Sequence, residues 1–161
     1  MNSIKKKIKY IENKIKNPMK GLPDEVFYFI GRNTPYINVD LLIKCPKKGI
    51  LLTWRDDIYA GKGWHLPGGI IRFRETIKKR VKMVGKNELN LNIIKSKGPL
   101  EINEIIIKKQ KERSHFISLL YECEVKKSEL KNIKKNNLIN FFKNKPKNLL
   151  KLHNIYKNYF K

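Results

Sequence analysis

Residues 64–69 read Trp-His-Leu-Pro-Gly-Gly, and residues 70–75 lead from this turn to Glu75. The Pro-Gly-Gly turn leaves its backbone groups uncovered by side chains, so a cation or a phosphate can approach the main chain closely. Apolar residues at helical spacing over 75–90 predict a helix that begins at Glu75 and carries Glu88 near its end. This loop and this helix are therefore the candidate site for chemistry.

The segments around this stretch predict a layered α+β domain. Apolar, β-branched runs predict strands at residues 36–44, 50–55, 91–108 and 115–125, and residues 64–74 form a further extended stretch that the Pro-Gly-Gly turn breaks. The Cys-Pro-Lys-Lys-Gly turn at 45–49 predicts that the first two runs form a hairpin. Helical spacing predicts further helices, at residues 4–16, 23–30 and 148–159. Residues 126–137 are rich in Lys and Asn and too short to separate two domains. We expect a single domain over residues 21–161, preceded by a helical extension over residues 1–20.

Composition narrows the classes of protein without naming a function. The 161 residues carry 37 Lys or Arg against 14 Asp or Glu, a formal net charge of +23. Such a charge favours polyanionic partners, among them nucleotides, nucleic acid and anionic membrane surfaces. Lys, Asn and Ile are also what an AT-rich coding sequence produces. Solvated surface lysines therefore explain the charge equally well.

The sequence also bears on the compartment of the protein. No apolar run is long enough to span a bilayer, and no apolar segment follows the basic N-terminus as it does in a signal peptide. The two cysteines, Cys45 and Cys123, cannot form a disulfide framework, and we expect them to be buried free thiols. These features predict a cytoplasmic protein.

The helix expected at 4–16 is basic and amphipathic. Ile4, Ile8, Ile11 and Ile15 share one face, and lysines occupy many of the other positions. Such a helix can bind a membrane surface or nucleic acid. We favour the simpler interpretation, in which the isoleucines pack on the domain or on a second subunit of a homodimer.

Gly69 and Glu75 have the spacing of the first half of the Nudix hydrolase signature, which continues with Arg-Glu-x-x-Glu-Glu-x-Gly. Residues 83–90, Met-Val-Gly-Lys-Asn-Glu-Leu-Asn, keep only Glu88 of the second half, and Met83 removes the arginine that would pair with Glu75. At about 100° per residue, positions 84, 87 and 88 lie on one helical face, so Glu88 is the only carboxylate there. One carboxylate with carbonyl oxygens and waters can hold one Mg²⁺ but is a poor cage for two or three.

The GDP-mannose mannosyl hydrolase branch of the Nudix family has a similarly reduced signature, and the resemblance extends beyond it. Four segments of this chain resemble that branch in order and spacing: Asn-Thr-Pro-Tyr-Ile-Asn-Val-Asp-Leu-Leu-Ile at 33–43, Leu-Leu-Thr-Trp-Arg at 51–55, Gly-Trp-His-Leu-Pro-Gly-Gly at 63–69 and Ser-His-Phe-Ile at 114–117. The resemblance implies a Nudix fold, with a mixed β-sheet between helices. It further implies Mg²⁺-dependent hydrolysis of a nucleotide sugar, in which water attacks the anomeric carbon and a nucleoside diphosphate leaves.

The resemblance assigns roles to residues of this chain. It places the metal on the Gly68 carbonyl and Glu88, with Asn136 as a weaker third ligand. The residues implied to bind substrate are Asp40 and Arg55. Two further arginines of the family are replaced here by Ile70 and Met83, and Arg72 is a candidate substrate-binding residue because it lies close by in sequence. Gly69 and Glu75 are expected to have a structural role next to the metal ligands, without binding the metal themselves.

At the position of the general base this chain departs from the family, whose Gln-His pair aligns with Asn136 and Asn137 here. Asparagine cannot act as a base near neutral pH. The candidates for the catalytic base are therefore His65, His115 and Asp40. A histidine base predicts a rate that rises with pH through a pKa near that of histidine. We expect His153, on the last helix, to have only a surface or packing role.

Two other functions stay open at this stage. The first keeps the fold but breaks a diphosphate bond by attack at phosphorus, as ordinary Nudix enzymes do. The second is a non-catalytic protein that binds RNA through its basic surface. The intact Pro-Gly-Gly turn with Glu75 and Glu88 makes the RNA-binding alternative the less favoured.

Overall fold

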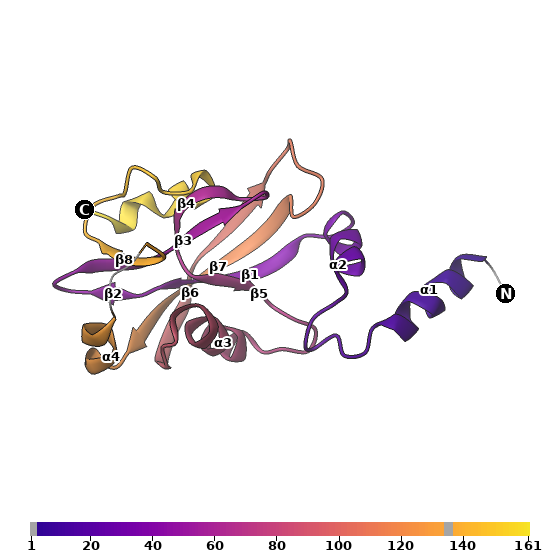
Figure 1. Cartoon of the computed structure of the whole chain (residues 1–161), viewed down its shortest axis with the longest axis horizontal. Coiled ribbons are helices and arrows are strands. Elements are labelled where there is room, and N and C mark those ends of the chain that lie inside the picture. Colours follow the sequence, from indigo (N-terminus) through magenta and orange to yellow (C-terminus); the bar gives the residue numbers. More distant parts are fainter. Residues whose placement is uncertain (1–2, 134–136) are drawn as a thin grey trace.

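The structure is a computed structural model that describes residues 3–133 and 137–161. It confirms the α+β class (Figure 1). In chain order the elements are α1 (Ser3–Lys14), α2 (Asp24–Gly31), β1 (Tyr36–Leu42), β2 (Lys44–Cys45), β3 (Gly49–Asp57), β4 (Gly61–His65), β5 (Gly68–Ile70), α3 (Ile77–Leu89), β6 (Ile93–Ile106), β7 (His115–Val125), α4 (Lys127–Asn132), β8 (Ile139–Phe142) and the 3₁₀ helix η1 (Lys151–Tyr159).

The strands form two sheets rather than the single sheet that was expected. The first has the order β5-β1-β7-β6, in which β1 and β7 are parallel and the other pairs antiparallel. The second is built on β3, which pairs antiparallel with β2, β4 and β8. The predicted hairpin is therefore wrong for β1, whose two edges are occupied by β5 and β7. Only β2, just past the end of β1, pairs with β3.

Side chains alternate along β1 and divide the core into two parts. Val39 and Leu41 pack in one cluster with Val81 and Val84 of α3. Leu42 belongs to the other cluster, on the opposite face of the first sheet, together with Tyr156 of η1. Because successive strand residues point to opposite faces, Asp40 faces the second cluster rather than α3. This alternation directs a carboxylate into the interior of the protein.

Helix α3 is close to its predicted range and begins slightly later. Thr76 caps its N-terminus, with its hydroxyl oxygen accepting the Lys79 N–H at 3.2 Å, so the helix starts after Glu75. Asn90, at φ 53°, ends it. A Cβ on Gly85 would lie 2.6 Å from Ile93 Cγ1, so this mid-helix glycine lets α3 pack closely on β6.

The C-terminal third departs most from prediction. The helix expected at 148–159 is a 3₁₀ helix over Lys151–Tyr159. It begins late because residues 148–150 form hydrogen bonds with β4: Trp64 N–H donates to Asn148 O, and Leu150 N–H donates to Trp64 O. Helix α4 was missed within 126–137, because Leu130 is its only buried residue and leaves no apolar periodicity.

The expectations for the helices before β1 are confirmed, and the expectation of a buried free thiol is confirmed for Cys123 but not fully for Cys45. The two helices before β1 lie close to their predicted ranges. Cys45 and Cys123 are free thiols, although Cys45 is only half-buried. Among the helices in the described residues, none is both long enough and apolar enough to cross a bilayer.

Candidate functional site

A cleft follows the line of β1 between the two sheets. Its inner end is lined by Asp40, Arg55, His65, Gly68 and His153. Its outer end is lined by Tyr59, Gln110, Arg113, Phe116, Ile105 and Ile107. Arg55 and His65 also line an adjoining hollow that contains Glu88. The cleft thus has a polar end near the Pro-Gly-Gly turn and a more apolar end near the loop between β6 and β7.

Asp40 lies at the inner end and is almost fully buried. Its Oδ2 accepts hydrogen bonds from Ser118 Oγ at 2.5 Å and from Tyr156 OH at 2.7 Å. Its Oδ1 accepts a longer bond, 3.2 Å, from Asn38 Nδ2. Burial raises the pKa of the Asp40 carboxyl, and the bonds from Ser118 and Tyr156 lower it in part. Asp40 therefore lines the cleft and also fastens η1 to the first sheet.

Gly68, Glu88 and Arg55 surround the point where α3 approaches the Pro-Gly-Gly turn. Burial raises the pKa of Glu88 to about 7, while Arg55 and a hydrogen bond from the Gly68 backbone oppose this shift. A Cβ at Gly68 would come within 2.3 Å of Asp40 Oδ1, so only glycine fits beside that carboxylate. The Arg55 charge also lowers the pKa of Asp40 and of two histidines. Arg55 is the cation shared by all the ionisable groups at the inner end.

Glu75 is committed to an internal ion pair. Its Oε2 accepts from Arg80 Nη2 at 2.6 Å, from Arg80 Nε at 2.7 Å and from the Arg72 backbone N–H at 3.1 Å. The two paired side chains are only 6% and 8% exposed. The expectation that Glu75 lacks an arginine partner is therefore wrong, because Arg80 takes that place. Gly69 lies beside this pair, where a Cβ would meet Val84 Cγ2 at 2.9 Å.

The donor set fits one metal ion. Within residues 3–133 and 137–161, no group of three or more His, Cys, Asp or Glu side chains is arranged to hold a metal. With Glu75 paired to Arg80, Glu88 is a largely buried carboxylate beside the Gly68 backbone, and a cation there would favour its ionised form. Glu88, carbonyl oxygens and waters suit a single Mg²⁺. The third ligand expected from the sequence, Asn136, lies outside the described residues.

The two histidines expected near the site have different surroundings. His65 is buried, and its Nδ1–H donates to the Thr53 carbonyl oxygen at 2.8 Å. Burial and Arg55 lower the pKa of His65 to about 3, so His65 does not produce the rate change expected near the ordinary pKa of histidine. His115 does not line the cleft. Its Nε2 lies 3.0 Å from Glu104 Oε1, beside a separate hollow near the end of α2.

His153 is a residue of the cleft that the sequence analysis missed. Its ring lies 5.5 Å from that of His65, and its Nδ1 accepts the Leu66 N–H at 3.3 Å. This bond places the proton of the neutral ring on Nε2. Burial and Arg55 lower the pKa of His153 to about 3. Its spacing from Leu149 and Tyr156 puts it on the apolar face of the last helix, which was the available signal.

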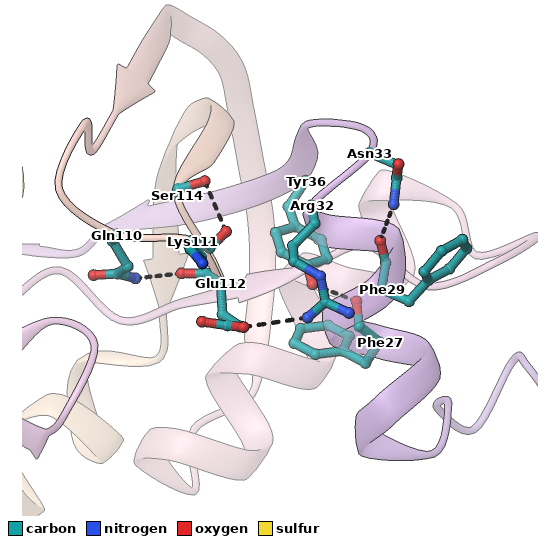
Figure 2. A network of polar contacts seen from close by, with 9 residues as sticks. All are labelled: Phe27, Phe29, Arg32, Asn33, Tyr36, Gln110, Lys111, Glu112 and Ser114. Atoms are coloured by element: carbon teal, nitrogen blue, oxygen red, sulfur yellow. Dashed lines mark hydrogen bonds and ion pairs between the residues drawn. The ribbon is translucent and has the colours of Figure 1, made fainter.

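The outer end of the cleft carries a second arginine, Arg113. Its guanidinium lies over the Tyr59 ring at 5.4 Å, and its Nε is buried without a hydrogen-bond partner among the described residues. The loop that holds it is tied to the end of α2 by the Arg32–Glu112 ion pair, 3.2 Å, as Figure 2 shows. Gln110 Nε2 donates to the Glu112 and Arg113 carbonyl oxygens and stiffens the same loop.

Arg72, the second arginine expected from the sequence, is not part of the cleft lining. The residue is exposed, and its backbone N–H is bonded to Glu75. Sequence proximity to the Pro-Gly-Gly turn favoured Arg72. Arg113 is distant in sequence and reaches the cleft only because β6 and β7 bring their connecting loop back to β1.

Several solved structures have an architecture similar to that of this chain. A MutT Nudix hydrolase from Burkholderia pseudomallei superposes with a TM-score of 0.61 at 17% identity, over 80% of this chain and 99% of that one. The chain has the Nudix fold. Another similar structure is a Nudix hydrolase from Nitrosomonas europaea, with a TM-score of 0.50 at 12% identity over 74% of this chain and 68% of that one. In this Nudix fold, the Pro-Gly-Gly turn and α3 form the loop and helix that the sequence pattern predicted.

A third structure with the Nudix fold is a bifunctional NMN adenylyltransferase/ADP ribose pyrophosphatase from Francisella tularensis, with a TM-score of 0.51 at 17% identity over 78% of this chain and 39% of that one. No protein-family model matches the chain. One curated relative, the low-salt glycan biosynthesis protein Agl8 of Haloferax volcanii, is 31% identical over 81 residues, which are 50% of this chain. The match spans about half of that relative's length, 51%.

The histidine pair predicts how stability depends on pH. The ordinary histidine pKa is 6.5, and the pKa values of His65 and His153 are lowered to about 3 in the folded protein. Between these values the unfolded chain binds protons that the folded protein excludes, so the free energy of unfolding falls as the pH falls. Each histidine contributes a slope of up to about 1.4 kcal/mol per pH unit. Glu88 contributes a slope of the opposite sign, because its raised pKa makes the folded protein bind a proton that the unfolded chain releases.

Urea unfolding at several pH values between about 4 and 6 measures this slope. We expect replacement of His65 or of His153 by asparagine to make the stability less dependent on pH in this range. The carboxylates are present in every variant, so the difference between variant and parent isolates the imidazole. Equal slopes in the parent and both variants would show that neither histidine is held neutral.

Proposed function

We propose that this protein is a Mg²⁺-dependent hydrolase of a nucleotide sugar of the GDP-mannose kind, releasing the sugar and a nucleoside diphosphate. The observation that carries the proposal is the single available carboxylate at the Nudix helix, Glu88, set between the Gly68 backbone and Arg55. One metal and one arginine suit the neutralisation of a diphosphate leaving group. They suit less well the multi-metal attack on phosphorus made by ordinary Nudix enzymes.

In this proposal Glu88 and the Gly68 carbonyl hold Mg²⁺. When bound, the ion neutralises negative charge on the diphosphate. Arg55 offers its planar fork of N–H donors to the phosphate oxygens. His153 has its Nε2–H available as a further donor at the inner end of the cleft. These residues bind and orient the leaving group, and the inner end of the cleft receives the sugar.

The proposed base is one of the two acceptors at the inner end. The His65 Nδ1–H is held by the Thr53 carbonyl, so the lone pair of the neutral ring is on Nε2. Among the described residues, the hydrogen-bond donor to Asp40 Oδ1 is the Asn38 amide. Because its pKa is lowered to about 3, His65 is a weak base, and we expect turnover to be slow. His115 does not line the cleft and is not part of this proposal.

A second candidate is pyrophosphohydrolysis, with attack at phosphorus. The bifunctional Francisella protein, which shares the fold, has ADP ribose pyrophosphatase in its name. The Haloferax relative is named for glycan biosynthesis, which supports a sugar-bearing substrate for this chain. We favour the nucleotide sugar because Glu75 is engaged by Arg80, which leaves too few carboxylates for several metal ions.

The decisive experiment is hydrolysis of a panel of GDP-mannose, UDP-glucose and ADP-ribose with Mg²⁺, in water labelled with heavy oxygen. We expect GDP-mannose to be hydrolysed and the label to appear in the released sugar. Label in phosphate would instead identify a pyrophosphohydrolase. Absence of turnover together with micromolar RNA binding at about 150 mM salt would favour the non-catalytic, RNA-binding alternative.

A further inference from the structure

Helix α1 is an amphipathic element that contributes nothing to the core. None of its residues is buried, and it stands apart from both sheets, joined to α2 by residues 15–23 (Figure 1). Ile4, Ile8 and Ile11 are 64%, 50% and 40% exposed. Their spacing places them on one face of the helix. The expectation that this face packs on its own domain is therefore wrong.

The charge of α1 restricts what can cover that face. The helix holds five lysines and one glutamate, and the chain carries a net charge of +23. A second copy would bring the same charge against it, so self-association is opposed by repulsion. Nucleic acid would attract the lysines but offers no apolar surface to an isoleucine face. An anionic lipid surface offers both, since its acyl boundary accepts apolar side chains and its headgroups attract lysine.

We propose that α1 docks the protein on an anionic lipid surface, with its isoleucine face in the acyl boundary and its lysines against the lipid phosphates. The helix lies in the plane of the surface and does not cross it. Membrane attachment would use none of the residues of the cleft, so lipid binding and hydrolysis can be measured separately.

The test is co-sedimentation of the full chain with phosphatidylcholine vesicles, with and without phosphatidylglycerol. We expect binding only to the phosphatidylglycerol vesicles. The double substitution Ile8→Ser and Ile11→Ser should weaken that binding at least about tenfold, because it removes the apolar anchor. The control Ile58→Ser removes another exposed isoleucine, 89% exposed in the turn between β3 and β4, and should bind as the parent does.

Charge is tested by a matched pair of variants. Lys6→Glu with Lys9→Glu reverses two charges on α1, and Lys127→Glu with Lys131→Glu reverses two on α4. We expect only the α1 variant to lose binding, by about tenfold or more, since about 1 kcal/mol is gained for each lysine at an anionic surface. Thermal unfolding should be unchanged in the α1 variants, because α1 buries no residue.

Three results would overturn the proposal. Full vesicle binding by the α1 isoleucine variant would show that the apolar face is not used. Equal loss in both charge variants would show that overall charge alone drives binding. A dimeric parent and a monomeric isoleucine variant, by sedimentation velocity without vesicles, would assign the face to a second copy.

Discussion

Replacing Arg80 by methionine is expected to lower the free energy of unfolding by about 3–5 kcal/mol, because the change leaves the buried Glu75 carboxylate without its partner. The pair is 2.6 Å apart, with side chains only 8% and 6% exposed. Methionine replaces the apolar stem of the arginine side chain and removes its two donors to Glu75 Oε2. The change is measured by urea unfolding at neutral pH.

The matched control is Lys79→Met, which removes a charge from the neighbouring exposed position of α3. We expect this control to stay within about 0.5 kcal/mol of the parent. The double variant Glu75→Gln with Arg80→Met should recover part of the loss, since no charge is then left unpaired in the interior. A single Arg80 variant as stable as the Lys79 control would show that the pair contributes nothing to stability.

The Glu75–Arg80 pair shows which features of this site could be predicted from the sequence and which could not. Gly69 and Glu75 predicted the turn and the helix, and both are present. The partner of Glu75 was not predicted, because Glu75 precedes the helix and its reach to Arg80 depends on how residues 72–76 turn. Helical spacing places a residue on a face, but it does not place a loop residue beside that face.

The cleft shows a similar division. Alternation along β1 is a local property, so the inward direction of Asp40 follows from the sequence of that strand. The approach of His153 depends on where the last segment crosses the first sheet, and the position of Arg113 depends on the loop between β6 and β7. Both are long-range contacts that no local pattern encodes. The apolar periodicity of η1 was visible, but its 3₁₀ geometry and late start follow from the contact of residues 148–150 with β4.

Replacing Glu88 by glutamine is expected to reduce Mg²⁺-dependent turnover by at least about a hundredfold, because it removes the only carboxylate that α3 offers to the metal. The fold should survive. Burial raises the pKa of Glu88 to about 7, so at lower pH this site holds a neutral carboxyl group, which costs about as much to bury as the amide of glutamine. Above that pH the parent must hold an ionised carboxylate, and the variant should be at least as stable.

The control is Glu124→Gln, which makes the same chemical change at an exposed position of β7. Asn87→Ala tests the neighbouring position on α3 and should also have little effect. Initial rates are measured on the substrate that the labelled-water experiment identifies, across a Mg²⁺ titration. Full activity in the Glu88 variant would place the metal elsewhere. Loss of activity with an unchanged or raised unfolding temperature would identify Glu88 as a metal ligand rather than a structural residue. Neutralising a structural carboxylate that is paired as Glu75 is would instead destabilise the protein.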